Sequence, residues 1–397
     1  MPSRIKMQER VDRISAVADR YVSSGSFSSI EWAIDVDGSS LSAGKIGKAD
    51  QETGADVPDG ALYRIYSMTK PLISVLALQL IEQGRLRLSD LLPQFDDRFA
   101  RMMVLTPEGQ IQAAERPITV DDLLTHRAGF TYEFVHGCHI AQYYREAKLS
   151  YNDDSLDEMM GNLATLPLGF HPGSKYGYGV STDVLAHVIE RATGRGVDTL
   201  LADQIFEPLG MEDTAYYVPE GKQSRLITMY GREGFLDAPA FAVGKQELVL
   251  VDVTPYYPVN SQAFRRGGIG LYSTLADYRK FAIMLLDGKS ADGEVLLSRK
   301  MVQMMSVNRI APHQGPVGFG PGVMKGYGWG LVGRLLVDQG QTMSLASTGE
   351  LSGGGGASTY FWVDPSERMT GVIMTQYLGA SLPLAADLQT AAYQALS

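Results

Sequence analysis

The sequence has little of what would make the protein secreted or membrane-bound. Of its 397 residues only Cys138 is a cysteine, which excludes an intramolecular disulfide and fits a reducing compartment. No apolar run is long enough to cross a membrane. Residues 1–6 are polar and lack the apolar core of a signal peptide. We therefore expect a cytoplasmic protein.

An excess of positive charge is also absent. The formal net charge of -10 at pH 7 argues against nucleic acids and anionic membranes as partners. Apolar residues make up 45% of the chain and charged residues 20%, a balance that can fill a large core. The length fits two domains, or one large domain with an insertion. We expect a small molecule as the partner, and the sequence leaves a homo-oligomer open.

The stretch at 63–71, YRIYSMTKP, places Ser67 three residues before Lys70, at the start of an apolar segment that ends near residue 83. The segment predicts a buried helix, and Pro71 suits its first turn. At a helix entry, unpaired backbone N–H groups would stabilise an oxyanion beside Ser67. Burial would disfavour the charged form of Lys70, so that its amine can take the hydroxyl proton. Alone, the pair also fits an N-cap serine and a solvated lysine.

Regular patterns lie at both ends of the chain. A helix at 8–22 and a hairpin at 30–46 come first, and strands at 358–363 and 369–375 precede a helix at 384–396. Short helices lie between; capping signals open two, at Thr119 and Thr274. We predict an α/β (α+β) fold, in which an antiparallel sheet built from both chain ends is flanked by helices and carries a mainly helical insertion.

Domain boundaries follow from this pattern. Residues 1–88 and 265–397 are assigned to the α/β domain, and residues 89–264 to the mainly helical domain. The active site would lie in the cleft between them.

Six stretches follow one another along the chain: YRIYSMTKP at 63–71, ITVDDLLTHRAGFTY at 118–132, PGSKYGYGVSTDVLAHVIERATG at 172–194, IFEPLGMEDT at 205–214, RRGGIGLYSTLADYRKFAIMLL at 265–286 and GGGGASTYFWVDP at 353–365. In this order they resemble the serine β-lactamase and penicillin-binding-protein superfamily, several members of which use Ser-x-x-Lys as the nucleophile motif. The resemblance is greatest to family VIII carboxylesterases, which are esterases related to class C β-lactamases. It implies the β-lactamase/transpeptidase-like fold.

The resemblance also implies roles for individual residues. Ser67 matches the family nucleophile, and Lys70 matches its partner lysine. Tyr178, counted back from the start of the following helix, matches the catalytic tyrosine, whereas Tyr176 falls where a tryptophan is common. Gly356 matches the second oxyanion donor, which would act together with the N–H of Ser67.

The third motif departs from the family pattern. Lactamases and peptidases carry Lys-Thr-Gly or His-Thr-Gly there, but this chain has Gly353, Gly354 and Gly355. Glycines let the backbone approach a ligand, so we assign these three residues to substrate binding, with Tyr176 as either a fourth member or a packing aromatic. Without a cation at position 353, recognition of a substrate carboxylate is lost, unless Arg266 reaches over to supply the charge.

The resulting hypothesis is a serine hydrolase that cleaves short-chain, neutral carboxylic esters through an acyl-enzyme on Ser67. Lys70 and Tyr178 would be the proton-transfer partners, and neither cofactor nor metal is implied. Alternatives on the same fold are a β-lactamase, a D-amino-acid peptidase or amidase, and an acyltransferase. An inactive binding module is a further alternative, against which the intact trio argues. A Ser-His-Asp hydrolase is disfavoured because the chain has no Gly-x-Ser-x-Gly elbow.

Histidines give weaker signals. His136 and His139 flank Cys138 in what we interpret as a polar loop, because a zinc site needs further ligands. His126 follows a predicted helix end and is interpreted as a structural hydrogen-bonding residue.

Two further groups have open interpretations. Arg265 and Arg266 lie beside a glycine turn, and we place both at the surface. Four aromatic residues either wall an acyl pocket or pack elsewhere: Tyr132, Tyr256, Tyr257 and Trp329.

Overall fold

The computed structural model describes residues 4–149, 154–232, 247–319, 322–380 and 382–396. Its centre is a seven-stranded sheet of order β11-β12-β13-β14-β15-β1-β2, in which every neighbouring pair is antiparallel. The sheet is built from both ends of the chain, as predicted. Its strands are β1 (Ser29–Val36), β2 (Ser39–Gly47), β11 (Tyr327–Trp329), β12 (Arg334–Leu336), β13 (Leu351–Gly354), β14 (Tyr360–Asp364) and β15 (Met369–Met374).

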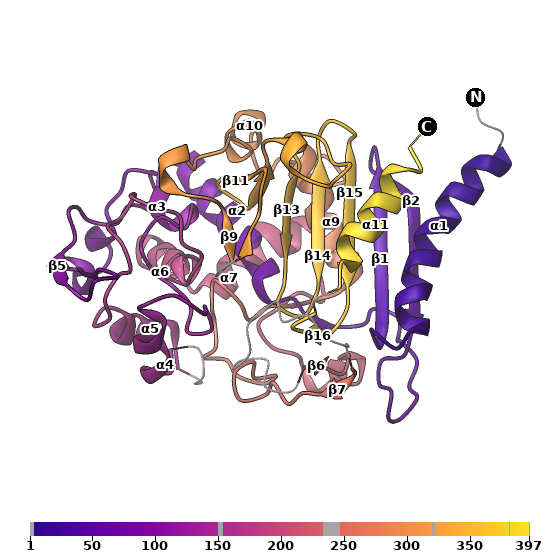
Figure 1. The fold of residues 1–397 in the computed structure, drawn as a ribbon, viewed down its shortest axis with the longest axis horizontal. Coiled ribbons are helices and arrows are strands. Elements are labelled where there is room, and N and C mark those ends of the chain that lie inside the picture. The colour runs from indigo at the N-terminus through magenta and orange to yellow at the C-terminus, as the bar shows by residue number, and fades with distance from the viewer. Residues whose placement is uncertain (1–3, 150–153, 233–246, 320–321, 381, 397) are drawn as a thin grey trace.

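Helices pack on both faces of this sheet (Figure 1). On one face lie α1 (Arg4–Ser23) and α11 (Leu384–Tyr393), and on the other lies α9 (Leu275–Asp287). Side chains along β14 alternate between the two cores: Phe361 and Val363 join the core that contains α9, whereas Trp362 joins the core under α1 and α11. This alternation is the period of two that a strand covered on both sides requires.

The predicted catalytic helix is present and buried on all sides. Ser67 lies in one turn of 3-10 helix, Tyr66–Met68, which leads directly into α2 (Thr69–Glu82). Every residue of α2 from Thr69 to Leu80 is buried. Just before Ser67, β3 (Tyr63–Arg64) pairs with β8 (Tyr272–Ser273), which ties the serine to the segment before α9.

The middle of the chain is mainly helical. In the described part of residues 89–264 the strands are short, and β6 pairs with β16 (Tyr377–Leu378) near the C-terminus. The boundaries at residues 88 and 264 stay a prediction. The elements are α3 (Val120–Leu124), α4 (Ala141–Glu146), α5 (Leu156–Leu163), α6 (Ser181–Thr193), α7 (Val197–Leu201), α8 (Glu207–Leu209), β4 (Met103–Leu105), β5 (Ile111–Ala113), β6 (Tyr230–Gly231) and β7 (Val249–Leu250).

Local signals located several elements well. The Thr119 hydroxyl accepts from the Asp122 N–H at 3.2 Å and opens α3, and Thr274 does the same for Asp277 at 3.1 Å before α9. The glycine run at 353–356 precedes the strand β14. Gly353 and its neighbour Gly354 belong to β13, where pairing with β14 overrides their low strand propensity.

Three small elements complete the described chain: α10 (Arg299–Met305), β9 (Gly318–Phe319) and β10 (Gly322–Val323). None of the helices in the described ranges is both long enough and apolar enough to traverse a bilayer.

Candidate active site

Lys70 is held against Ser67. Its Nζ donates to Ser67 Oγ at 3.1 Å and to the Gly268 carbonyl at 2.7 Å. The side chain is buried, and Nζ lies 4.9 Å from the ring centroid of Tyr178 and 5.1 Å from that of Tyr132. Among the described residues, no carboxylate lies within ion-pair distance of this amine. The lysine is therefore surrounded by neutral acceptors and aromatic rings, and it can exchange a proton with Ser67.

The backbone immediately before Ser67 is strained. Tyr66 has a φ of 44°, in the left-handed region that bulky residues rarely occupy. Its buried ring packs on that of Tyr257, with the centroids 4.8 Å apart. Such an outlier persists only where the surroundings hold it, and it is common beside reactive groups. Here it fixes the turn that presents Ser67 to the cavity described below.

Two backbone N–H groups are available beside Ser67. Gly356 lies in the turn after β13. A hydrogen bond from the Gly355 N–H to the Thr359 carbonyl, 2.9 Å long, joins the two ends of this turn. A Cβ on Gly356 would lie 3.3 Å from the Tyr66 ring, so this turn packs beside the Ser67 turn. Within the described ranges, neither the Ser67 nor the Gly356 N–H donates to a backbone carbonyl. Both can therefore donate to an oxyanion.

Tyr178, rather than Tyr176, is the tyrosine beside Lys70. The Tyr178 ring lies 4.6 Å from the His126 ring and 5.9 Å from the Trp329 ring. In the described structure its hydroxyl makes no hydrogen bond to Ser67 or Lys70. Catalytic hydrogen bonds are often long without a substrate and shorten when the substrate binds. Tyr176 packs on Trp329 at 5.6 Å, and burial raises the pKa of its hydroxyl well above the usual value.

A cavity of about 450 Å³ opens over these groups. Its wall contains Ser67, Lys70 and the whole glycine run at 353–356, which brings all predicted substrate-binding residues to one space. Tyr257 is outside it, buried with its hydroxyl donating to the Leu271 carbonyl. The remaining lining is mostly apolar, and its aromatic members include Tyr66, Tyr132, Phe134, Tyr176, Tyr178, Tyr256, Phe319, Trp329 and Tyr360.

Asp183 holds Gly268, the residue whose carbonyl contacts Lys70, a role that the sequence reasoning missed. It lies in the first turn of α6, is buried, and its Oδ1 accepts from the Gly268 N–H at 2.9 Å. The carbonyl of the same Gly268 accepts from Lys70. Burial raises the pKa of Asp183, whereas the Lys70 charge and the Gly268 hydrogen bond oppose that rise. The sequence offered one signal for this role, namely that Asp183 lies five residues after Tyr178.

The arginines differ from expectation. Placing Arg266 at the surface was wrong: it is 1% exposed, and its Nη1 donates to the Ser155 carbonyl at 3.1 Å. Arg266 is not among the residues that line the cavity, so it does not replace the missing cation of the third motif. Arg265 forms a partly exposed ion pair with Asp198 at 3.0 Å. Arg334, which the sequence did not single out, does line the cavity.

His126 is buried with a φ of 54°, and burial together with the Lys70 charge lowers its pKa well below the usual value. It packs on Tyr178, so its contribution is the shape of the site. His139 Nε2 lies 2.6 Å from the Leu105 carbonyl.

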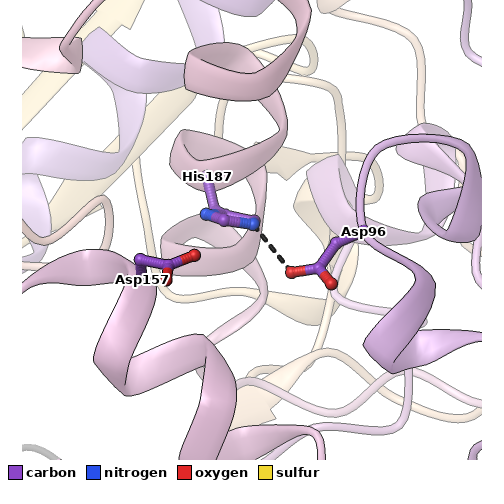
Figure 2. A group of neighbouring side chains, drawn as sticks. All are labelled: Asp96, Asp157 and His187. Atoms are coloured by element: carbon purple, nitrogen blue, oxygen red, sulfur yellow. Dashed lines mark hydrogen bonds and ion pairs between the residues drawn. The ribbon is translucent and has the colours of Figure 1, made fainter.

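One group of possible metal ligands occurs in the described ranges, formed by Asp96, Asp157 and His187 (Figure 2). His187 Nε2 lies 2.9 Å from Asp96 Oδ2. The Arg98 guanidinium donates to both oxygens of Asp96 and, at 2.6 Å, to Asp157. Because Arg98 pairs with both acids and Arg191 lies 3.7 Å from Asp157, we interpret the group as an ion-pair network that joins α5 and α6 to residues 96–98.

Comparisons with known proteins show the family and the fold of this chain. The Beta-lactamase family model matches residues 14–394. Protein Rv1367c of Mycobacterium tuberculosis (strain ATCC 25618 / H37Rv) is 30% identical, covering 85% of this chain and 82% of its own. Esterase EstB of Burkholderia gladioli is 27% identical, covering 87% and 86%.

The structure of EstCE1, described as a hydrolase with promiscuous acyltransferase activity, superimposes with a TM-score of 0.82 at 22% identity and covers 98% of this chain and 100% of its own. These matches confirm the predicted β-lactamase/transpeptidase-like fold, an antiparallel sheet flanked by helices.

Proposed function

Because this chain belongs to the Beta-lactamase family, we propose that it is a serine hydrolase that cleaves carboxylic esters through an acyl-enzyme on Ser67. The observation that carries the proposal is the 3.1 Å contact between Lys70 Nζ and Ser67 Oγ in the floor of an aromatic cavity. The similarity to Esterase EstB supports esters as the substrate class.

The proposed reaction uses groups that lie together. Lys70 or Tyr178 takes the Ser67 proton as Oγ attacks the ester carbonyl, and the N–H groups of Ser67 and Gly356 bind the oxyanion. The C–O bond to the alcohol then breaks, and Tyr178 returns a proton to the leaving alkoxide. Water attacks the acyl-enzyme by the reverse sequence and releases the acid and Ser67.

We propose that the substrate group beside Gly353 is short and uncharged. A β-lactam or a peptide C-terminus presents a carboxylate to the third motif, and glycine at position 353 offers no charge to meet it. A Cβ at this position would lie 2.9 Å from Phe361 Cε1, so Gly353→Lys is not a usable test of this point. A charged hydrogen bond is worth about 1.5–3 kcal/mol, or roughly ten- to a hundredfold in rate.

The test compares kcat/KM for p-nitrophenyl acetate and butyrate with that for nitrocefin and a D-Ala-D-Ala peptide. We expect the esters to exceed the other two by at least about tenfold. Equal turnover of nitrocefin or the peptide would remove the ester assignment. Failure to turn over any of the four would remove the hydrolase itself.

A second candidate is transfer of the acyl group to an alcohol. The aromatic lining of the cavity favours it, because such a wall binds an apolar alcohol in place of water, and EstCE1 is described as having this activity. Benzyl alcohol added during hydrolysis of p-nitrophenyl butyrate should then yield benzyl butyrate. If butyrate remains the sole acyl product at high alcohol concentration, transfer is excluded.

A further inference from the structure

Arg334 is a cation in the cavity wall whose contacts are all uncharged. Its Nε and Nη2 donate to Ser352 Oγ at 3.2 and 2.9 Å, and Nη2 also donates to the Tyr360 hydroxyl. Nη1 lies 3.2 Å from Met324 Sδ, a weak acceptor, and the guanidinium carbon lies 4.4 Å from the Tyr327 ring centroid. A partly buried guanidinium placed in this way attracts an anion strongly, because little water competes for it.

No carboxylate of the described residues lies within ion-pair distance of Arg334. Glu350 is near enough for its charge to be felt, but it is fully buried and accepts a hydrogen bond from Gln389 at 2.9 Å. Burial also raises the Glu350 pKa, which favours the uncharged acid. The charge of Arg334 is therefore left for a group that enters the cavity.

Arg334 lies beside the strand that leads to the oxyanion donor Gly356. It stands on β12 directly opposite Ser352, and the oxyanion donor Gly356 is four residues further along the chain from Ser352. At about 3.3 Å per residue, that separation is at most about 13 Å. Since Ser67 and Arg334 line the same cavity, one substrate can reach both.

We propose that Arg334 binds a carboxylate carried by the substrate at the end remote from the reacting ester, so that the preferred substrates are carboxylate-bearing esters. The inference rests on the proposed function and deepens it. It agrees with an uncharged group beside Gly353, because Ser352, which Arg334 contacts, pairs with Trp362, whereas Gly353 pairs with Phe361 on the opposite face of the sheet. A carboxylate fits better than a phosphate, since a single guanidinium matches a single negative charge.

The test uses esters that differ only in charge. For an anion on the acyl end, the mono-p-nitrophenyl ester of adipic acid is compared with p-nitrophenyl methyl adipate. For an anion on the alcohol end, 4-butyryloxybenzoate is compared with its methyl ester. Each pair is measured with the wild type, Arg334→Gln, Arg334→Lys and Arg87→Gln. Arg87 is the matched control, because its side chain is 74% exposed and outside the cavity lining.

In at least one pair we expect the wild type to prefer the carboxylate ester by tenfold or more in kcat/KM. Arg334→Gln should lower the kcat/KM of the carboxylate ester by about ten- to a hundredfold and should change the kcat/KM of the neutral ester by less than about threefold. Arg334→Lys should lose part of the preference, since the ammonium lacks the planar fork, and Arg87→Gln should change neither ester.

Two outcomes would overturn the carboxylate site and leave the proposed function standing. One is turnover of all four esters without a charge preference. The other is an equal loss for both members of each pair in a folded Arg334→Gln. Absence of any turnover by the wild type would overturn the proposed function as well. If Arg334→Gln does not fold, the test is made with the wild type, by measuring how strongly added compounds inhibit its hydrolysis of p-nitrophenyl acetate. Hexanoate should then inhibit at least tenfold more strongly than hexanamide, and equal inhibition would refute the carboxylate site.

Discussion

Two polar clusters in this molecule differ in how their charges are matched. In the ion-pair network, Arg98 meets both Asp96 and Asp157, and His187 lies against Asp96. At the candidate active site, Lys70 meets only the Ser67 hydroxyl and a backbone carbonyl.

The difference separates groups that hold the fold from groups that can react. In the network, although burial would raise the Asp96 pKa, the hydrogen bonds from Arg98 lower it below the usual value, so the carboxylate stays charged. A group locked in one charge state stabilises its neighbours but does not pass protons. In the described residues no carboxylate pairs with the amine of Lys70, which contacts Ser67 and Gly268 instead. The following predictions test this contrast, from the largest expected effect to the smallest.

Lys70→Met removes the amine and keeps an apolar chain of similar length. We expect kcat to fall on the order of 10³-fold or more, because the site loses one of the two groups through which the Ser67 proton would move. Stability in urea should change little, because the variant removes no ion pair. Steady-state kinetics with p-nitrophenyl butyrate check this, and retention of a tenth of the wild-type kcat would show that Lys70 is structural.

Tyr178→Phe should lower kcat by roughly 10²-fold, the scale of a positioned proton-transfer group. Tyr176→Phe is the matched control, because it removes the same hydroxyl from a ring that packs on Trp329 without facing Lys70. Its effect should be much smaller. A larger loss in Tyr176→Phe would reverse the assignment of the catalytic tyrosine.

Asp183→Ala should lower kcat by roughly tenfold, because Gly268 loses the anchor that holds its carbonyl against Lys70. Asp183→Asn can still accept from the Gly268 N–H, so it should lose less activity. Asp277→Asn is the control, since Asp277 is an equally buried acid that accepts from the Asp213 N–H at 2.8 Å, away from the site. The acid limb of the pH–rate profile should move in the Asp183 variants and stay in place for Asp277→Asn.

Arg98→Gln should lower the free energy of unfolding by roughly 2–4 kcal/mol, because Asp96 is left buried without its cation. The kcat at 25 °C should stay within about twofold of the wild type, since no residue of the network lines the cavity. Urea unfolding beside ester kinetics measures both quantities. A large loss of kcat in the folded variant would contradict a purely structural network.

His126→Asn should make stability less sensitive to acid. Because burial lowers the folded-state pKa of His126, acidification below about pH 6.5 protonates the unfolded chain first and destabilises the wild type. Asparagine tolerates the left-handed backbone at this position. Between pH 7 and 5.5 the wild type should lose about 1.4 kcal/mol more than the variant. Identical losses in urea titrations would show that His126 does not act in this way.

The sequence predicted best what depends on neighbouring residues. The contact between Ser67 and Lys70 follows from their spacing of three at a helix entry, and the caps at Thr119 and Thr274 follow from equally local patterns. The roles of Asp183 and Arg334 could not be read in this way. Each depends on residues distant in the chain, Gly268 for one and Ser352 with Tyr360 for the other, which only the folded sheet and loops bring together.

The glycine run shows the same limit in the backbone. Glycine has a low strand propensity, yet pairing with β14 makes Gly353 and Gly354 the end of a strand. Only the turn that follows places Gly356 against the Tyr66 ring.

The most direct test of the account is the identity of the acylated residue. The wild type is mixed briefly with p-nitrophenyl butyrate or a fluorophosphonate, quenched in acid and mapped by peptide mass spectrometry. The account predicts one added acyl or phosphonyl group on the peptide that contains Ser67, and no label in Ser67→Ala. A label on another residue, or full ester hydrolysis by Ser67→Ala, would contradict it.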